Sequence, residues 1–116
     1  MKYSHPEGQH SMALKWQDKD PDDQIDYSID WQSQLGTNTI STVVWKIYTN
    51  GAWAVWNQGQ IVDGLQYVSS TNTNTVATLY LGLGTDFTTY NIICRMTASD
   101  ATIIEQEVRL RVVEKN

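Results

Sequence analysis

Closely spaced carboxylates are the residues of this chain whose pattern most resembles a metal site. Asp18, Asp20 and Asp22 stand at alternate positions, and Asp23 follows them directly. Three carboxylates with that spacing open an EF-hand calcium loop. However, Asp23 stands where that loop needs a glycine, and Ile29 stands where it needs a bidentate glutamate. We therefore interpret the segment as a solvated acidic stretch and expect no metal site.

Nucleophilic catalysis would need a serine, cysteine or threonine close to a histidine that a third group orients. The only histidines, His5 and His10, fall in a polar N-terminal stretch without periodicity. Cys94, the only cysteine, alternates in phase with Ile92 and Met96, which is typical of a small buried apolar residue. A single cysteine also excludes an intramolecular disulfide and a multi-thiolate metal site. We expect no catalytic residues and no enzyme.

Cofactors, nucleic acid and membranes are disfavoured on similar grounds. Gly82 and Gly84 flank Leu83, but no helix follows them to present aligned amides to a phosphate, so no cofactor is expected. The net charge is -5 and the eight basic residues are scattered, which argues against nucleic acid as a partner. No apolar run approaches the roughly 20 residues that span a bilayer, and residues 1–11 are too polar for a signal peptide.

Alternating apolar residues are the main structural signal of the chain. In residues 25–31 the apolar side chains alternate with Asp26, Ser28 and Asp30, as in a half-buried strand, and we interpret those two aspartates as exposed charge. Further strands are predicted at residues 40–48, 52–56, 65–69, 76–83, 89–97 and 102–114. About seven short strands without helical periodicity predict an all-β fold, an immunoglobulin-like antiparallel β-sandwich, with a closed barrel as the alternative.

Local motifs agree with the sandwich. Asn50-Gly51 predicts a tight two-residue hairpin, because both positions of a type I′ turn need positive φ. Tyr90, with residues 81–86 before it, has the spacing of a tyrosine corner, in which the hydroxyl bonds the backbone a few residues upstream. Trp31 or Trp45 would supply the indole that packs between the sheets.

The first 23 residues lack periodicity and contain both prolines, Pro6 and Pro21. Together with their polar composition, this predicts a flexible, extended N-terminal arm at residues 1–23. Residues 24–116 then form the immunoglobulin-like domain.

The segment DPDDQIDYSIDW at residues 20–31, with Leu35-Gly36 and Thr39-Ile40 after it, is similar to the opening of a family of small tailed-phage virion proteins. These are the fiber-tail adaptor proteins. The likeness continues through the Thr-rich residues 72–78, residues 79–90, Arg95, Thr97 and the closing residues 109–112, and covers about residues 13–114. Residues 48–63 depart from the pattern because they are longer and more aromatic.

This resemblance implies an adaptor or connector in the tail or neck of a bacteriophage, made in the host bacterial cytoplasm and assembled into the virion. Its partners would be other virion proteins of the tail, neck or fiber, with several copies in a symmetric assembly and an N-terminal segment that grips a neighbour. The residues expected to contact partners are Trp16, Lys19, Asp20, Pro21, Asp22, Tyr48, Trp53 and Trp56.

Two interpretations of the tryptophan-rich hairpin stay open. Exposed indoles dominate protein–protein contacts, but they also stack on sugars. The alternative function is therefore a carbohydrate-binding module, in which Tyr48, Trp53 and Trp56 form a platform and neighbouring Asn50, Asn57 or Gln58 bond hydroxyls. Trp53 and Trp56 take opposite faces of an expected strand, so at least one of them should point away from the core.

Overall fold

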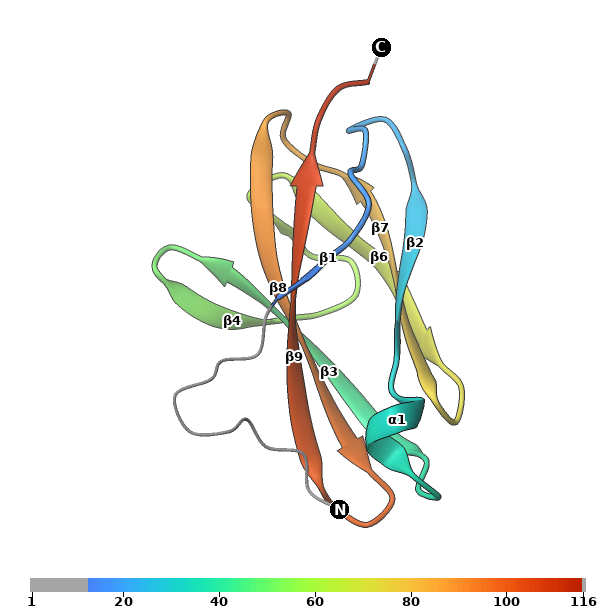
Figure 1. Cartoon of the computed structure of the whole chain (residues 1–116). Helices are drawn as coiled ribbons and strands as arrows, with labels where there is room; N and C mark the ends of the chain where they lie inside the picture. Colours follow the sequence, from blue (N-terminus) through green and yellow to red (C-terminus); the bar gives the residue numbers. More distant parts are fainter. Residues whose placement is uncertain (1–12, 116) are drawn as a thin grey trace.

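The computed structural model describes residues 13–115 and shows two β-sheets packed face to face (Figure 1). This is the predicted immunoglobulin-like sandwich. Its elements are β1 Leu14–Lys15, β2 Ile25–Asp30, α1 Gln32–Leu35, β3 Ile40–Thr49, β4 Ala52–Trp56, β5 Ile61–Val62, β6 Leu65–Asn72, β7 Val76–Leu83, β8 Thr88–Ala98 and β9 Ile103–Val112. The seven predicted strands are confirmed, and two strands of two residues and one short helix add to them.

The sheets have the strand orders β1-β9-β8-β3-β4 and β2-β7-β6-β5. Every pairing between neighbouring strands is antiparallel except that of β1 with β9, which is parallel. The chain therefore places four strands at sheet edges within the described residues: β1 and β4 in the five-stranded sheet, and β2 and β5 in the four-stranded sheet.

The core lies between the two sheets and is built by alternate side chains. In β8, for example, Ile92, Cys94 and Met96 are fully buried while the intervening Ile93 and Arg95 are not. This period of two places one face of each strand inside and the other outside. Both candidate core tryptophans, Trp31 and Trp45, are buried, so both contribute an indole to the core.

A bulge in β6 changes the expected orientation of its second half. The register with β7 shifts between Tyr67 and Ser69, so that Ser69 lies opposite Tyr80. A bulge adds one residue to one strand and reverses the faces that follow it. Ser69 therefore faces outward, although unbroken alternation from Leu65 and Tyr67 would place it inward.

The two predicted local motifs are confirmed. Asn50 and Gly51 have φ values of 54° and 80°, as the turn between β3 and β4 requires. The Tyr90 hydroxyl accepts a hydrogen bond from the Thr85 amide at 3.0 Å and donates one to the Asp63 carbonyl at 2.6 Å. The tyrosine corner therefore ties the loop after β7 to the loop between β5 and β6.

The N-terminal segment differs from the predicted free arm. Its first 12 residues, with His5, His10 and Pro6, lie outside the described residues, but Leu14 to Asp20 lie along the edge of β9. The Trp16 amide donates to the Arg109 carbonyl at 2.9 Å, and the Lys19 amide donates to the Arg111 carbonyl at 3.0 Å. We call residues 14–20 the N-terminal strap. Polar composition predicts disorder here, but the free edge of β9 offers the strap a hydrogen-bonding partner.

Two side chains of the strap reach into the sandwich. Trp16 is 8% exposed, and its ring stacks on Tyr27 with ring centroids 4.9 Å apart. Lys19 is 1% exposed, and its ammonium donates to the carbonyls of Asp20 and Leu83. Burial lowers the Lys19 pKa, against the opposing effect of nearby aspartates. The two carbonyls compensate for part of the cost of burying this charge.

The strap predicts a pattern of hydrogen exchange in the isolated chain. We expect the amides of Trp16 and Lys19 to be protected, because each donates to a carbonyl of β9. The Gln17 amide between them donates no hydrogen bond within the described part of the chain and serves as an internal control that exchanges fast. Fast exchange at all three amides would instead support an arm that becomes ordered only on docking.

The tyrosine corner predicts a large effect of a small substitution. We expect Tyr90→Phe to lower the free energy of unfolding by about 1–3 kcal/mol, because it removes one donor and one acceptor from a buried site. Urea denaturation measures this change. The matched control is Tyr48→Phe. The exposed Tyr48 hydroxyl makes no hydrogen bond to the described residues, so its loss should cost less than about 0.5 kcal/mol. Equal effects of the two substitutions would contradict a stabilising corner.

Candidate functional site

The structure divides the eight residues expected to contact partners into two groups. The side chains of Trp16, Lys19, Asp20 and Trp56 are buried in the domain. In this structure they pack within the fold, and a contact of these four with a partner stays a prediction. Pro21, Asp22, Tyr48 and Trp53 lie at the surface to different degrees. Protein contacts through these four stay a prediction.

Trp53 and Trp56 take opposite faces of β4, as the alternation predicted. Trp53 is 39% exposed, whereas Trp56 is 1% exposed and packs edge-on against Tyr67 at a centroid distance of 5.5 Å. The three-ring platform that the carbohydrate interpretation requires of Tyr48, Trp53 and Trp56 is therefore not formed.

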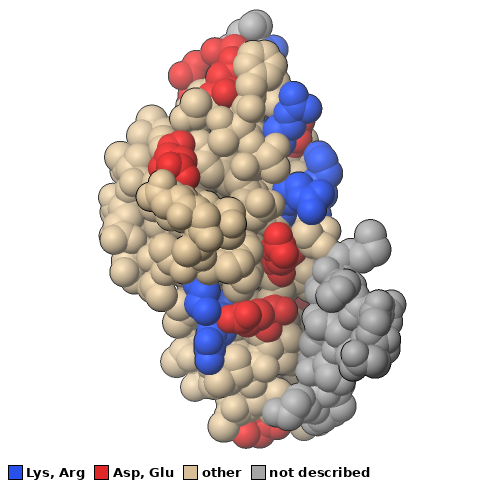
Figure 2. Space-filling view, turned by 90° about the vertical axis from the view of Figure 1, so that its left-hand side faces the viewer, with Lys and Arg blue, Asp and Glu red and all other residues tan. Residues whose placement is uncertain are grey.

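An exposed apolar cluster lies on the outer face of the five-stranded sheet. Tyr48 of β3 is paired with Trp53 of β4, and their rings meet edge to face at 5.3 Å. Val44 and Val55 are also exposed on these strands. We call Val44, Tyr48, Trp53 and Val55 the β3–β4 patch. Figure 2 shows this side of the molecule, where charged side chains form small separate groups around a broad uncharged area.

The patch continues to an open backbone edge. β4 is the last strand of its sheet, so the side of its backbone that faces away from β3 pairs with no strand of the described chain. Native proteins usually protect such edges with charges, proline, bulges or short length. The sequence of β4, AWAVW, contains neither charge nor proline. The other edges differ: β1 and β5 have two residues each, and β2 carries Asp26 and Asp30.

Charged side chains border the patch within the same sheet. The Lys46 ammonium lies 3.2 Å from the Glu105 carboxylate, and the Arg95 guanidinium lies 3.7 Å from it. Lys46 is opposite Val55 in the ladder, so this cluster adjoins the apolar side chains directly. An apolar centre with a polar rim is the usual composition of a protein interface.

A second group of carboxylates meets at the end of the sandwich where the C-terminus lies. Oxygens of Asp20, Asp22 and Glu114 lie within 4.8 Å of one another, and Figure 2 shows acidic side chains gathered at this end, at the top of the view. Both oxygens of Asp20 already accept backbone amides, from Asp22 at 2.8 Å and Lys115 at 2.9 Å. The cluster therefore fastens the strap to the C-terminal segment, and by itself it does not identify a metal site.

These contacts shift the pKa values of two carboxyls in opposite directions. The amide of Asp22 lowers the pKa of Asp20, with a further contribution from the amide of Lys115. The pKa of Glu114 is raised, first by its hydrogen bond with the Asp20 side chain and then by desolvation and by the charges of Asp20 and Asp22. The charged form of Glu114 is thus disfavoured beside Asp20.

Among the described residues, Cys94 is not placed for nucleophilic chemistry. Cys94 is fully buried, and desolvation raises its pKa to about 12, as expected for a packed thiol and not for a nucleophile. Both histidines of the sequence fall outside the described residues. The described part of the chain contains no helix long and apolar enough to cross a membrane.

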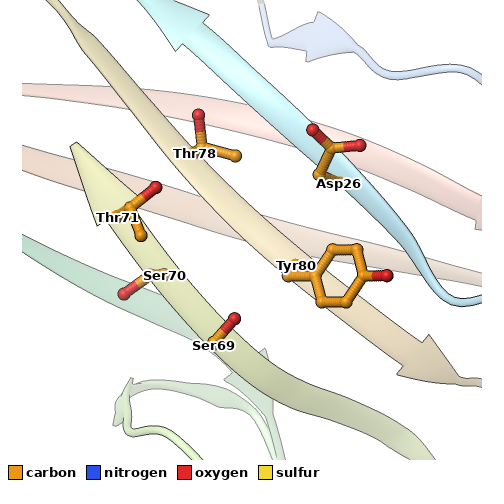
Figure 3. Close-up of a pocket in the computed structure, with 6 residues that line it drawn as sticks. All are labelled: Asp26, Ser69, Ser70, Thr71, Thr78 and Tyr80. Atoms are coloured by element: carbon orange, nitrogen blue, oxygen red, sulfur yellow. The ribbon is translucent and has the colours of Figure 1, made fainter. Parts of the chain in front are cut away.

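One surface feature had no clear signal in the sequence. A shallow hollow on the outer face of the four-stranded sheet is lined by Asp26, Ser69, Ser70, Thr71, Thr78 and Tyr80 (Figure 3). Asp26 was expected at the surface, and it is exposed. Its neighbours come together through the register of β6 and β7, which depends on the bulge in β6. The run of hydroxyl residues in β6 was the only signal available.

A family comparison decides what kind of protein this is. The family model described as podophage GP4 fiber-tail adaptor protein gp77 matches residues 19–111, which is most of the chain. The chain belongs to this family. The resemblance that the sequence carries at residues 20–31 and beyond is confirmed, and the match begins at Lys19, inside the strap.

Other comparisons add little. Among solved structures, the chain is similar to the solution structure of the PKD domain from KIAA 1837 protein, with 20% sequence identity. That likeness covers 98% of this chain and 94% of that chain at a TM-score of 0.47. None of the curated proteins matches the chain.

Membership of the Gp77 family gives the chain a coarse role. Fiber-tail adaptors are structural proteins of a phage, so the role is that of a tail adaptor and its place is the tail of the virion. A structural adaptor is consistent with a chain that is not an enzyme. Partners in such a role are other tail or fiber proteins.

The raised pKa of Glu114 predicts that Glu114→Gln stabilises the protein at pH 7. A raised folded-state pKa stabilises the fold when the group is protonated, and this contribution is lost as the pH rises through the folded-state pKa. Glutamine keeps the hydrogen bond to Asp20 and removes the charge. The gain in unfolding free energy should therefore be present at pH 7, shrink as the pH falls through the raised folded-state pKa, and be gone below the ordinary glutamate value of 4.5.

Thermal or urea unfolding across this pH range measures the effect. Glu105→Gln is the matched control, because it removes a glutamate that pairs with Lys46 and Arg95. It should lower stability at pH 7, by at most about 1 kcal/mol. A destabilising Glu114→Gln at pH 7 would show that the carboxylate is needed in its charged form.

Proposed function

We propose that this chain attaches fiber or tail components of a phage particle to one another through protein–protein contacts made by the β3–β4 patch. One observation carries the proposal: β4 is an uncharged edge strand whose outer face bears exposed Trp53 and Val55. An unprotected apolar edge invites pairing with another chain. In a tail adaptor, an assembly partner is the natural occupant of that edge.

The patch has the properties of a contact centre. Trp and Tyr are enriched among the residues that dominate binding energy, because each buries a large area at low entropic cost. Trp53 and Tyr48 already hold each other in one orientation through their edge-to-face contact. The partner therefore meets a surface that is organised before binding.

The backbone of β4 can add specificity to this contact. A strand of the partner that pairs with β4 would satisfy the outward amides and carbonyls and would place its own side chains over Trp53 and Val55. The ion pairs of Lys46 and Arg95 with Glu105 would then form the rim. We propose that several copies of the chain, placed symmetrically in the tail or neck, use the same contact.

A second contact is proposed for the surface residues that follow the strap. Asp22 is exposed and Pro21 is half-buried, beside a shallow hollow that extends to Gln66 and Leu83. Of the N-terminal residues expected to contact partners, these two are accessible. Neither contact needs nucleic acid, a membrane or catalysis.

The patch proposal predicts that Trp53→Glu folds normally but fails to assemble. We expect the amount of this variant in purified particles to fall by roughly tenfold or more, because a charge replaces the largest exposed side chain of the patch. Particles assembled in cells that supply the variant in place of the original chain provide the measurement, with quantitative mass spectrometry as the readout. The midpoint of urea unfolding should remain unchanged.

Phe87→Ala is the matched control for this experiment. Phe87 is 74% exposed and lies in the loop before β8, outside the patch, so its loss removes an exposed aromatic ring of similar kind. Normal assembly of Phe87→Ala beside failed assembly of Trp53→Glu supports the patch. Failed assembly of Phe87→Ala beside normal assembly of Trp53→Glu would indicate that the contact lies at the end of the sandwich that carries Phe87.

A further inference from the structure

The hollow on the four-stranded sheet faces away from the core, on the other layer of the sandwich from the β3–β4 patch. Its volume is about 380 Å³, and all six of its lining residues belong to β2, β6 and β7. It is built on paired strands and not on loops, so its side chains are held by the sheet.

Cross-strand register arranges the lining residues in two rows. Tyr80 of β7 lies between Asp26 of β2 and Ser69 of β6. In the next row, Thr78 lies between Ser28 and Thr71, and the hydroxyls of Ser28 and Thr78 are 2.8 Å apart. The bulge before Ser69 brings a hydroxyl opposite Tyr80, where unbroken alternation would have placed another residue.

Tyr80 forms the centre of the hollow. Figure 3 shows its ring face-on between Asp26 and Ser69, with the ring lying along the sheet surface instead of standing on its edge. The face of an aromatic ring carries partial negative charge. It therefore attracts the polarised C–H groups on the flat side of a pyranose ring, while hydroxyl groups around the rim of that ring reach outward.

The polar groups around Tyr80 match such a ligand. Within the described chain, no residue bonds the Asp26 carboxylate, so both of its oxygens are available to accept hydrogen bonds from hydroxyls. Hydrogen bonds to a charged acceptor are roughly twice as strong as those between neutral groups. Ser69, Thr71 and Thr78 each offer a hydroxyl that can donate or accept.

The charge of this face excludes anionic ligands. None of the four strands of this sheet contains a lysine or an arginine, and β2 contributes the carboxylates of Asp26 and Asp30. A phosphate, a sulfate or a uronic acid would meet only negative charge here. The ligand must therefore be uncharged or cationic, and the open ring face of Tyr80 together with three hydroxyls favours a sugar over a basic peptide.

We infer that the Tyr80 hollow binds neutral saccharides. The Tyr80 ring stacks on one pyranose, and Asp26, Ser69 and Thr78 bond its hydroxyl groups. The site is distinct from the β3–β4 patch, so an adaptor docked through the patch keeps this face free.

NMR titration of the full ¹⁵N-labelled chain tests the site. The neutral probes are cellohexaose, maltohexaose and chitohexaose, added to millimolar concentration, and the anionic control is trigalacturonic acid. We expect at least one neutral probe to shift the amide signals of Asp26, Ser69, Thr78 and Tyr80, and we expect trigalacturonic acid to shift none of them.

Three variants test whether binding of the sugar depends on stacking against the Tyr80 ring. Tyr80→Ala should weaken binding by roughly tenfold, whereas Tyr80→Phe keeps the ring and should stay within about threefold of the original affinity. Tyr48→Ala removes an exposed aromatic residue from the other sheet and should leave the affinity unchanged. Amide spectra that are unaltered away from the substituted residue establish that each variant folds.

Several results would overturn the inference. These are the absence of shifts with all three neutral probes, unchanged affinity in Tyr80→Ala, or shifts confined to Tyr48 and Trp53. Binding of a lysine-rich peptide to the hollow in the absence of any sugar response would assign the face to a basic protein segment instead. None of these outcomes depends on particle assembly, which is tested separately through Trp53.

Discussion

The position of Trp16 between the two sheets is the contact on which the arrangement of the other elements depends. Its ring stacks on Tyr27 of the four-stranded sheet and tilts against Trp45 of the five-stranded sheet at a centroid distance of 6.2 Å. Removal of a buried tryptophan typically costs about 3–5 kcal/mol. The strap therefore belongs to the folded domain, and its backbone pairing with β9 and the burial of Lys19 follow from where the indole lies.

The closed and open sides of the sandwich have different roles. The strap and the C-terminal segment lie along the edge of β9 and cover it. The opposite edge, at β4, is left open and apolar, and the outer face of the other sheet is polar and hydroxyl-rich. A small adaptor gains from this separation, because a protein contact and a ligand contact on different layers do not compete for the same residues.

Sequence patterns predicted most of the fold and a part of the site. Alternation located seven strands, and local turn chemistry located the Asn50-Gly51 hairpin and the Tyr90 corner, since both depend on residues close in the chain. The strap escaped prediction because a parallel pairing with distant β9 leaves no local period. Trp16, an indole within a polar segment, was the one available signal. Alternation also separated Trp53 from Trp56, but only packing decides which of the two is buried.

The parallel pairing of the strap with β9 has a mechanical consequence for a protein that joins parts of a tail. The strap and β9 run in the same direction. If the chain is pulled at the N-terminal end of the strap and at the C-terminal end of β9, the force acts along both strands and tends to slide one past the other. The bonds of Trp16 and Lys19 to β9, and that of the Val113 amide to the Lys19 carbonyl at 2.8 Å, then resist as a group in shear. A hairpin pulled apart at its open end, in contrast, would break its backbone hydrogen bonds one at a time.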